Sequence, residues 1–110
     1  MHIESLMGLY GAYGSHTTES CPLYNIENRN LIIKAHDKLK DIAAKGDVKL
    51  LQQYHSALEH TFTWIFDAKD AHSVQNFMTD SSWAKFNAVK IVPLSSYEHL
   101  IEVCKGLATE

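Results

Sequence analysis

The residues best suited to chemistry are a histidine and a cysteine, His16 and Cys21, which lie five positions apart in the segment HTTESCPLYN. Imidazole and thiolate groups both bind Zn²⁺, and copper is the second metal that prefers such ligands. His55 and His60 have the same spacing further along the chain, and Glu59 directly precedes His60. One cysteine and three histidines would complete a tetrahedral site, whereas a site with one histidine fewer would leave a position open for water.

The elements that must position these side chains follow from the spacing of apolar residues and from helix-capping residues. The sequence predicts strands over residues 3–13, 48–55, 60–66 and 86–92. It predicts helices over residues 26–45 and 71–79, and a last helix that ends near Leu107. Asn25 before the first helix, and the pair Ser95 and Glu98 before the last, have the spacing of N-terminal caps.

This order of elements predicts an α+β, ferredoxin-like βαββαβ domain over residues 1–110, followed by an extra C-terminal helix. Right-handed crossovers give the antiparallel sheet order 4-1-3-2. In that order His16, Cys21, His55 and His60 all arrive at one edge of the sheet. We expect the last two to face each other across the turn at residues 56–59, with Cβ atoms about 5 Å apart.

The third predicted strand carries Phe62, Trp64 and Phe66 on one face. Because the two longer helices are expected to cover one face of the sheet, we expect these rings to lie on the other, bare face. A bare aromatic face is a typical protein interface. The sequence therefore predicts that two copies pack face to face as a homodimer.

Composition narrows the class of protein and its partners. The chain has 110 residues, of which 45% are hydrophobic and 21% charged, as in folded globular domains. A net charge of -3 without a basic cluster argues against nucleic acid or acidic membranes as partners. No segment approaches the ~20 apolar residues of a membrane span. Only two cysteines, Cys21 and Cys104, are present, which favours a reducing cytoplasm. The sequence does not decide whether one disulfide joins them.

Structural roles compete with these chemical ones. Histidines in turns are often ordinary polar residues, a Cys-Pro pair in a loop is often structural, and no contiguous metal-binding motif is present. His36, His72 and His99 are expected at the surface, and Cys104 is expected as a small buried residue of the last helix. A nucleophilic Cys21 ranks below a metal-binding one, because no third group that would orient its base is evident.

Three segments resemble the dimeric α/β-barrel superfamily: HTTESCP at residues 16–22, Glu59-His60, and IVPL at residues 91–94 before a helix that contains Glu98. The chain is similar to small members of that superfamily with a His-x4-Cys-Pro loop. The wider group includes muconolactone isomerases, cofactor-independent monooxygenases and haem-degrading enzymes. The resemblance implies a ferredoxin-like protomer, a dimer through the open sheet face, and a pocket between sheet and helices. It does not transfer a reaction.

Two functions from different classes follow. The first is a cytoplasmic protein that binds zinc, or less favourably copper, through His16, Cys21, His60 and His55, and that is a metalloenzyme if water keeps one position. The second is a metal-free enzyme, isomerase- or monooxygenase-like, which acts on a small hydrophobic or aromatic molecule with His60 as general base and Glu59 as a further candidate. A structural or regulatory dimer without chemistry is the third reading.

Overall fold

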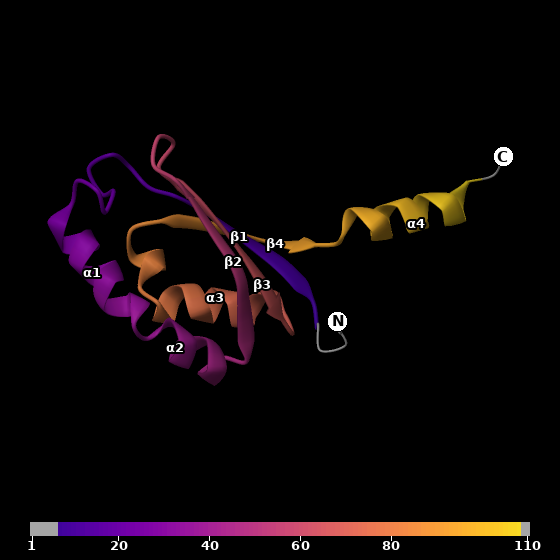
Figure 1. Cartoon of the computed structure of the whole chain (residues 1–110), viewed down its shortest axis with the longest axis horizontal. Helices are drawn as coiled ribbons and strands as arrows, with labels where there is room; N and C mark the ends of the chain where they lie inside the picture. The colour runs from indigo at the N-terminus through magenta and orange to yellow at the C-terminus, as the bar shows by residue number, and fades with distance from the viewer. Residues whose placement is uncertain (1–6, 109–110) are drawn as a thin grey trace.

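The computed structural model describes residues 7–108 as an α+β fold built around one four-stranded antiparallel sheet (Figure 1). The elements are, in chain order, β1 (Leu9–Ser15), α1 (Ile26–His36), α2 (Leu39–Lys45), β2 (Val48–Ser56), β3 (Thr61–Ala68), α3 (Ala71–Asp80), the 3₁₀ helix η1 (Trp83–Lys85), β4 (Ala88–Leu94) and α4 (Tyr97–Leu107). The sheet order is β2-β3-β1-β4. The predicted βαββαβ-like order, sheet order and extra C-terminal helix are therefore confirmed. Residues 3–6 of the predicted first strand lie outside the described part.

The helix predicted over residues 26–45 is two helices, α1 and α2. Asn25 caps α1 as expected, since its side-chain oxygen accepts a hydrogen bond from the Asn28 N–H at 2.9 Å. Asp37 and Lys38 separate the two helices. Leu39 and Ile42 of α2 pack against the core, whereas α1 buries Ala35 alone.

The aromatic side chains of β3 lie on the face that the helices cover, so the prediction of a bare aromatic face is wrong. Phe66 packs edge-on against Phe77 of α3, with ring centroids 5.1 Å apart. Trp64 packs against Trp83 of η1, also at 5.1 Å. A two-residue period places alternate side chains on one face, but it does not say which face meets the helices. The apolar side of α3, with Val74 and Phe77, settles that choice by burial.

The opposite face of the sheet is formed by the alternate residues of each strand. In the strand register Tyr13 of β1 lies between Thr63 of β3 and Lys90 of β4, and the neighbouring row contains Ile65 and Val92. This open face is therefore a mixture of apolar and polar side chains.

One glycine in β1 is required by close packing near the end of that strand. A Cβ atom added at Gly14 would overlap the ring of Phe62, its partner in the register. The ring of Phe62 can therefore cover the end of β1 just before His16. Phe62 in turn packs edge-on against Trp83, with centroids 5.3 Å apart. This packing anchors the chain where the first candidate ligand follows.

The last helix, α4, extends away from the sheet and the other helices (Figure 1). It buries none of its residues. Cys104 is exposed, so the prediction that it is buried is wrong, and both cysteines are free. The cap is Ser96 and not Ser95, because the Ser96 hydroxyl accepts from the His99 N–H at 3.0 Å. No helix within residues 7–108 has the length and apolar character needed to cross a membrane.

Candidate metal centre

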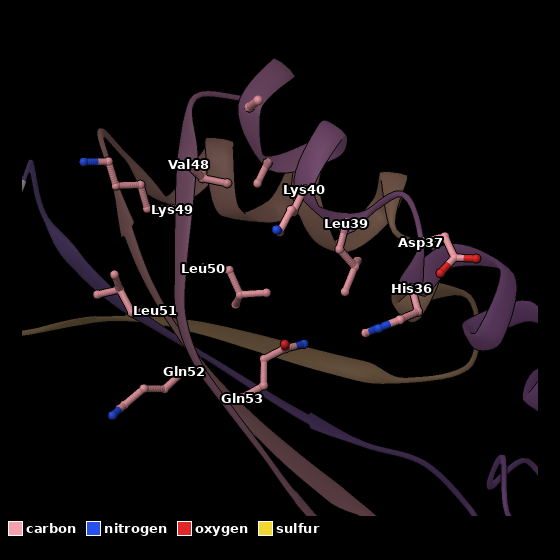
Figure 2. A pocket seen from close by; sticks show the side chains of 12 residues that line it. His36, Asp37, Leu39, Lys40, Val48, Lys49, Leu50, Leu51, Gln52 and Gln53 are labelled. Atoms are coloured by element: carbon pink, nitrogen blue, oxygen red, sulfur yellow. The ribbon is translucent and has the colours of Figure 1, made fainter.

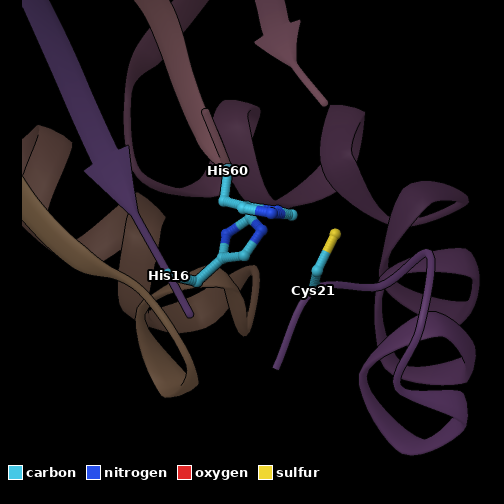
Figure 3. Close-up of side chains that lie close together, drawn as sticks. All are labelled: His16, Cys21 and His60. Carbon is cyan, nitrogen blue, oxygen red and sulfur yellow. The ribbon is translucent and has the colours of Figure 1, made fainter. Parts of the chain in front are cut away.

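Three of the four predicted ligands meet where β1 ends and β3 begins. His16 follows β1, Cys21 lies in the loop before α1, and His60 is the last residue of the turn between β2 and β3. Their side chains point toward a common space (Figure 3). One ligand atom from each lies within 4.8 Å of the other two. Two separate parts of the chain therefore offer two nitrogens and one sulfur to a single point.

The pairing of β1 with β3 places the two histidines opposite each other. The last pair in the register joins Ser15 to Thr61, and beyond it the His16 N–H donates to the His60 carbonyl at 3.0 Å. The two imidazole centroids are 5.6 Å apart. The backbone ladder itself therefore sets the separation of these two candidate ligands.

The imidazole of His16 is held in one orientation by Asn87. The Asn87 amide donates from Nδ2 to the Trp83 carbonyl at 3.0 Å, which turns its Oδ1 toward the ring. His16 Nδ1 lies 2.8 Å from that oxygen and therefore carries the proton that it donates. The other nitrogen, Nε2, is buried and has no hydrogen-bond partner among the described residues. The free lone pair of His16 is thus on a buried atom.

The imidazole of His60 has the complementary arrangement. Its Nε2 lies 3.3 Å from the Thr18 hydroxyl, and its Nδ1 is buried without a partner in the described structure. His60 also has a φ of 58°. That backbone region suits glycine and costs energy for other residues. His60 therefore keeps a large side chain at a turn position where the backbone conformation favours glycine.

The thiol of Cys21 is fully buried, with 0% exposure. Its own backbone is fixed on both sides: the Cys21 N–H donates to the Thr18 carbonyl at 3.2 Å, and its carbonyl accepts from the Asn25 N–H at 2.7 Å. Arg29 of α1 ties the loop down further by donating from Nε to the Pro22 carbonyl at 3.0 Å. The loop thus holds the sulfur in place before any ion binds.

The fourth predicted ligand, His55, does not join this group. The hairpin closes at the pair Ser56 and Thr61, so His55 pairs with Phe62 in the ladder and is exposed. The expected closing pair of His55 and His60 is wrong by one residue. The shift moves His60 out of the strand and into the turn, so that His55 lies opposite Phe62 and not opposite His60.

The other candidates lie away from the centre. Glu59 is exposed in the turn and is not one of the three grouped residues. His36, His72 and His99 are exposed, as predicted. His2 lies outside the described residues.

Sequence reasoning missed the groups around the ligands. Asn87 directly precedes β4, and β4 starts at the same end of the sheet as β3. The topology could therefore have predicted that Asn87 lies near the ligands. Nothing in the sequence pointed to Thr18. Two rings also border the histidines: Phe86 lies 5.8 Å from His16 and Tyr24 lies 6.3 Å from His60, between ring centroids.

The arrangement matches the ligand set of a three-ligand zinc site. Tetrahedral Zn²⁺ has Zn–N distances of about 2.0–2.1 Å and Zn–S distances of about 2.3 Å, which place its ligand atoms roughly 3.4 Å apart. The observed limit of 4.8 Å is wider than this. Binding of one ion would therefore draw the three ligand atoms together by about 1 Å.

Comparison with known proteins identifies the family. A family model described as "Domain of unknown function (DUF3303)" matches residues 21–108. Cys21 and His60 lie within the matched segment, and His16 lies before it. No curated protein matches the chain in sequence. Because the match covers most of the chain, this protein belongs to the DUF3303 family.

Proposed function

We propose that the chain binds one Zn²⁺ ion through His16 Nε2, Cys21 Sγ and His60 Nδ1. Copper is the second candidate metal. The fourth coordination position is then open to water or to a small molecule, as in catalytic zinc sites.

The observation that carries this proposal is a pair of buried imidazole nitrogens, beside a buried thiol, that have no hydrogen-bond partner among residues 7–108. A buried polar atom that lacks a hydrogen bond costs about 1–3 kcal/mol. Each histidine has one such nitrogen, and His16, Cys21 and His60 form one group in which a ligand atom of each residue lies within 4.8 Å of the others. One metal ion would satisfy all three atoms at once, because a deprotonated thiol and two neutral imidazoles are the ligand forms that zinc takes.

The surroundings of both histidines support metal binding. A ligating histidine usually donates its second ring N–H to an oxygen, which fixes the tautomer and the ring plane. Asn87 Oδ1 does this for His16. The Thr18 hydroxyl lies where it would accept the Nε2 proton of His60 once Nδ1 holds a metal.

Zn²⁺ is favoured over copper because Zn²⁺ has no preferred geometry of its own. Two histidines and one cysteine also occur in copper sites, which usually add a weak axial methionine. The sequence has no methionine between Met7 and Met78, so the ligand loops themselves supply none. Zn²⁺ has no such requirement and tolerates three ligands plus water.

We also propose a ferredoxin-like domain that spans the whole chain and forms a homodimer of the dimeric α/β-barrel type. The open sheet face is the candidate contact surface. It carries Tyr13 and Ile65, which are only half-buried, and Val92, which is exposed.

Metal-free catalysis at the same residues is the second candidate function. It is favoured by Asn87, which orients His16 as it would orient a base beside a nucleophilic thiol. Against it, a thiol with 0% exposure is closed to a substrate. A nucleophile also needs one base, which leaves the buried Nδ1 of His60 unexplained.

Elemental analysis of protein purified without a histidine tag tests the proposal. We expect close to one zinc per chain after incubation with Zn²⁺ and removal of the excess. His60→Ala should lose it, whereas the matched surface variant His36→Ala should keep it, because that ring is exposed and outside the group. Less than a tenth of an equivalent of zinc or copper in the wild-type chain would exclude a metal centre.

A further inference from the structure

Helix α4 has an apolar face that nothing covers within residues 7–108. Its apolar residues recur at helical spacing and so share one side of the helix: Tyr97, Leu100, Ile101, Cys104 and Leu107. Leu100 is 51% exposed and Leu107 is 74% exposed. An amphipathic helix of this kind is stable in water only when its apolar side packs against another surface.

A groove of matching character lies on the opposite edge of the sheet, between α2 and β2. We name it the α2–β2 groove; its cavity volume is about 810 Å³. Leu39 of α2 and Leu50 of β2 line it from its two walls, as Figure 2 shows. Val48 and Ala43 also contribute to it, and Leu51 is 46% exposed along the bare side of β2.

The bare side of β2 is itself unusual. β2 is an edge strand of 9 residues. A long exposed edge strand is prone to unwanted pairing, and proteins commonly cover such an edge with a helix or a loop. A helix packed along β2 would therefore cover both the α2–β2 groove and the exposed edge strand.

The strand register places the start of α4 and the groove at the same end of the sheet. Leu9 of β1 pairs with Leu94, the last residue of β4, and also with Asp67, which pairs in turn with Lys49 of β2. Leu94 and Lys49 thus lie in one row at opposite edges. The row spans three strand spacings, or about 14 Å.

Two residues, Ser95 and Ser96, join β4 to α4, and the three Cα–Cα steps from Leu94 to Tyr97 reach at most about 11 Å. They cannot bring the start of α4 across the sheet to its own groove. The whole apolar face can be seated only in the groove of another chain whose β2 edge lies beside this β4 edge.

We propose that α4 of one copy packs its apolar face into the α2–β2 groove of a second copy. Charge agrees with this pairing: Lys40, Lys49 and one aspartate, Asp37, line the groove, whereas α4 carries Glu98 and Glu102 with one lysine. Because the two copies are identical, the exchange can be reciprocal, and each helix then covers the edge strand of its partner.

The native Cys104 on α4 allows a direct test. The variant Ala44→Cys places a second thiol on the α2 wall of the groove, where residue 44 is exposed. Mild oxidation should then give a disulfide-linked product of twice the chain mass. Adding Cys104→Ser should abolish it. The matched control Glu27→Cys, an exposed site on α1 outside both the groove and the open sheet face, should give at least tenfold less product.

Each alternative position of α4 has its own signature, and each would overturn the proposal. A 44–104 disulfide at the mass of a single chain would mean that α4 folds back onto its own groove. Stronger crosslinking of a further variant, Lys90→Cys on the open sheet face, that is lost when Cys104→Ser is added would place α4 on that face. A crosslinked dimer of the wild-type chain would mean that two α4 helices meet each other, and no product in any variant would mean that α4 stays free.

A second set of variants tests the apolar contact itself. Combining Leu100→Asp and Leu107→Asp with Ala44→Cys should lower the crosslink yield at least tenfold, whereas His99→Asp on the polar side should not. An undiminished yield in the leucine variant would contradict the proposal. Zinc content should be unchanged in every variant, so this test fails or succeeds independently of the metal centre.

Discussion

The metal-centre end of the sheet and helix α4 are incomplete in opposite ways. At the first, two polar atoms, His16 Nε2 and His60 Nδ1, are buried and have no hydrogen-bond partner in the described part of the chain. In the second, apolar side chains such as Leu107 are exposed without partners. Both conditions cost free energy, but they call for different remedies. Buried lone pairs beside a thiol call for an ion, whereas an exposed apolar stripe calls for another surface.

The two cysteines provide the strongest test of this difference. Cys21 belongs to the buried group and Cys104 to the exposed helix. With free Zn²⁺ at about 100 times its dissociation constant, the wild-type chain should gain about 2.7 kcal/mol of stability. Cys21→Ser should lose this gain and Cys104→Ser should keep it, as measured by thermal unfolding with zinc and with a chelator. Equal gains in both variants would mean that zinc binds elsewhere.

Asn87 does not bind the metal in this proposal but orients the ligand His16, so its removal tests that supporting hydrogen bond. Removal of a group that orients a metal ligand typically lowers metal affinity about 10- to 100-fold. We expect this loss for Asn87→Ala, measured by competition with a chromophoric chelator. His99→Ala in α4 is the control and should leave the affinity within about twofold of wild type. Unchanged affinity in Asn87→Ala would show that the hydrogen bond to His16 does not support a metal.

His60 should separate stability from binding. Its φ of 58° is strained for an L-residue, and its Nδ1 is buried with no hydrogen-bond partner among the residues that the structure describes. His60→Gly should therefore raise the stability of the metal-free chain by about 1 kcal/mol, although it abolishes zinc binding. Urea unfolding in the presence of a chelator measures the change. His60→Ala keeps the backbone strain and should gain less; a loss of stability in the glycine variant would refute the strain argument.

The smallest expected effect concerns the cap of α3. The backbone N–H of Ser73 donates to Asp70 and, with the Ser73 hydroxyl, lowers the pKa of that carboxyl below its usual value. A lowered pKa in the folded state adds stability above the pKa of the unfolded chain, and this stability is lost as pH falls through the folded-state pKa. Unfolding free energies should therefore fall more steeply below about pH 4 in wild type than in Asp70→Asn. Parallel curves would contradict this.

Much of the fold could be predicted from the sequence because the signals are local. Apolar spacing and caps such as Asn25 located the helices, and the order of elements with right-handed crossovers led to the observed sheet order. The errors share one physical cause. Patterns along the chain say which side chains share a face, but not what that face meets. The rings of β3 were therefore assigned to the bare face, and Cys104 was expected to be buried.

The sequence predicted which strand ends meet at the candidate site, but not the direction of every side chain there. Topology alone brought His16, Cys21 and His60 together. It failed for His55 because the turn lies one residue later in the chain than expected: Ser56 and Thr61 close the hairpin, and His60 lies in the turn outside the ladder. The positive φ of His60 reflects the turn geometry that results.

By itself, the sequence determined the order of elements, their pairing and the residue types that arrive at each end of the sheet, because these depend on local spacing and on chain connectivity. Only the tertiary structure decided which nitrogen of each imidazole is free. That choice depends on Asn87 and Thr18, which approach the rings from other segments. It also left the apolar face of α4 without cover among the described residues, since a two-residue linker cannot bring that helix back to its own α2–β2 groove.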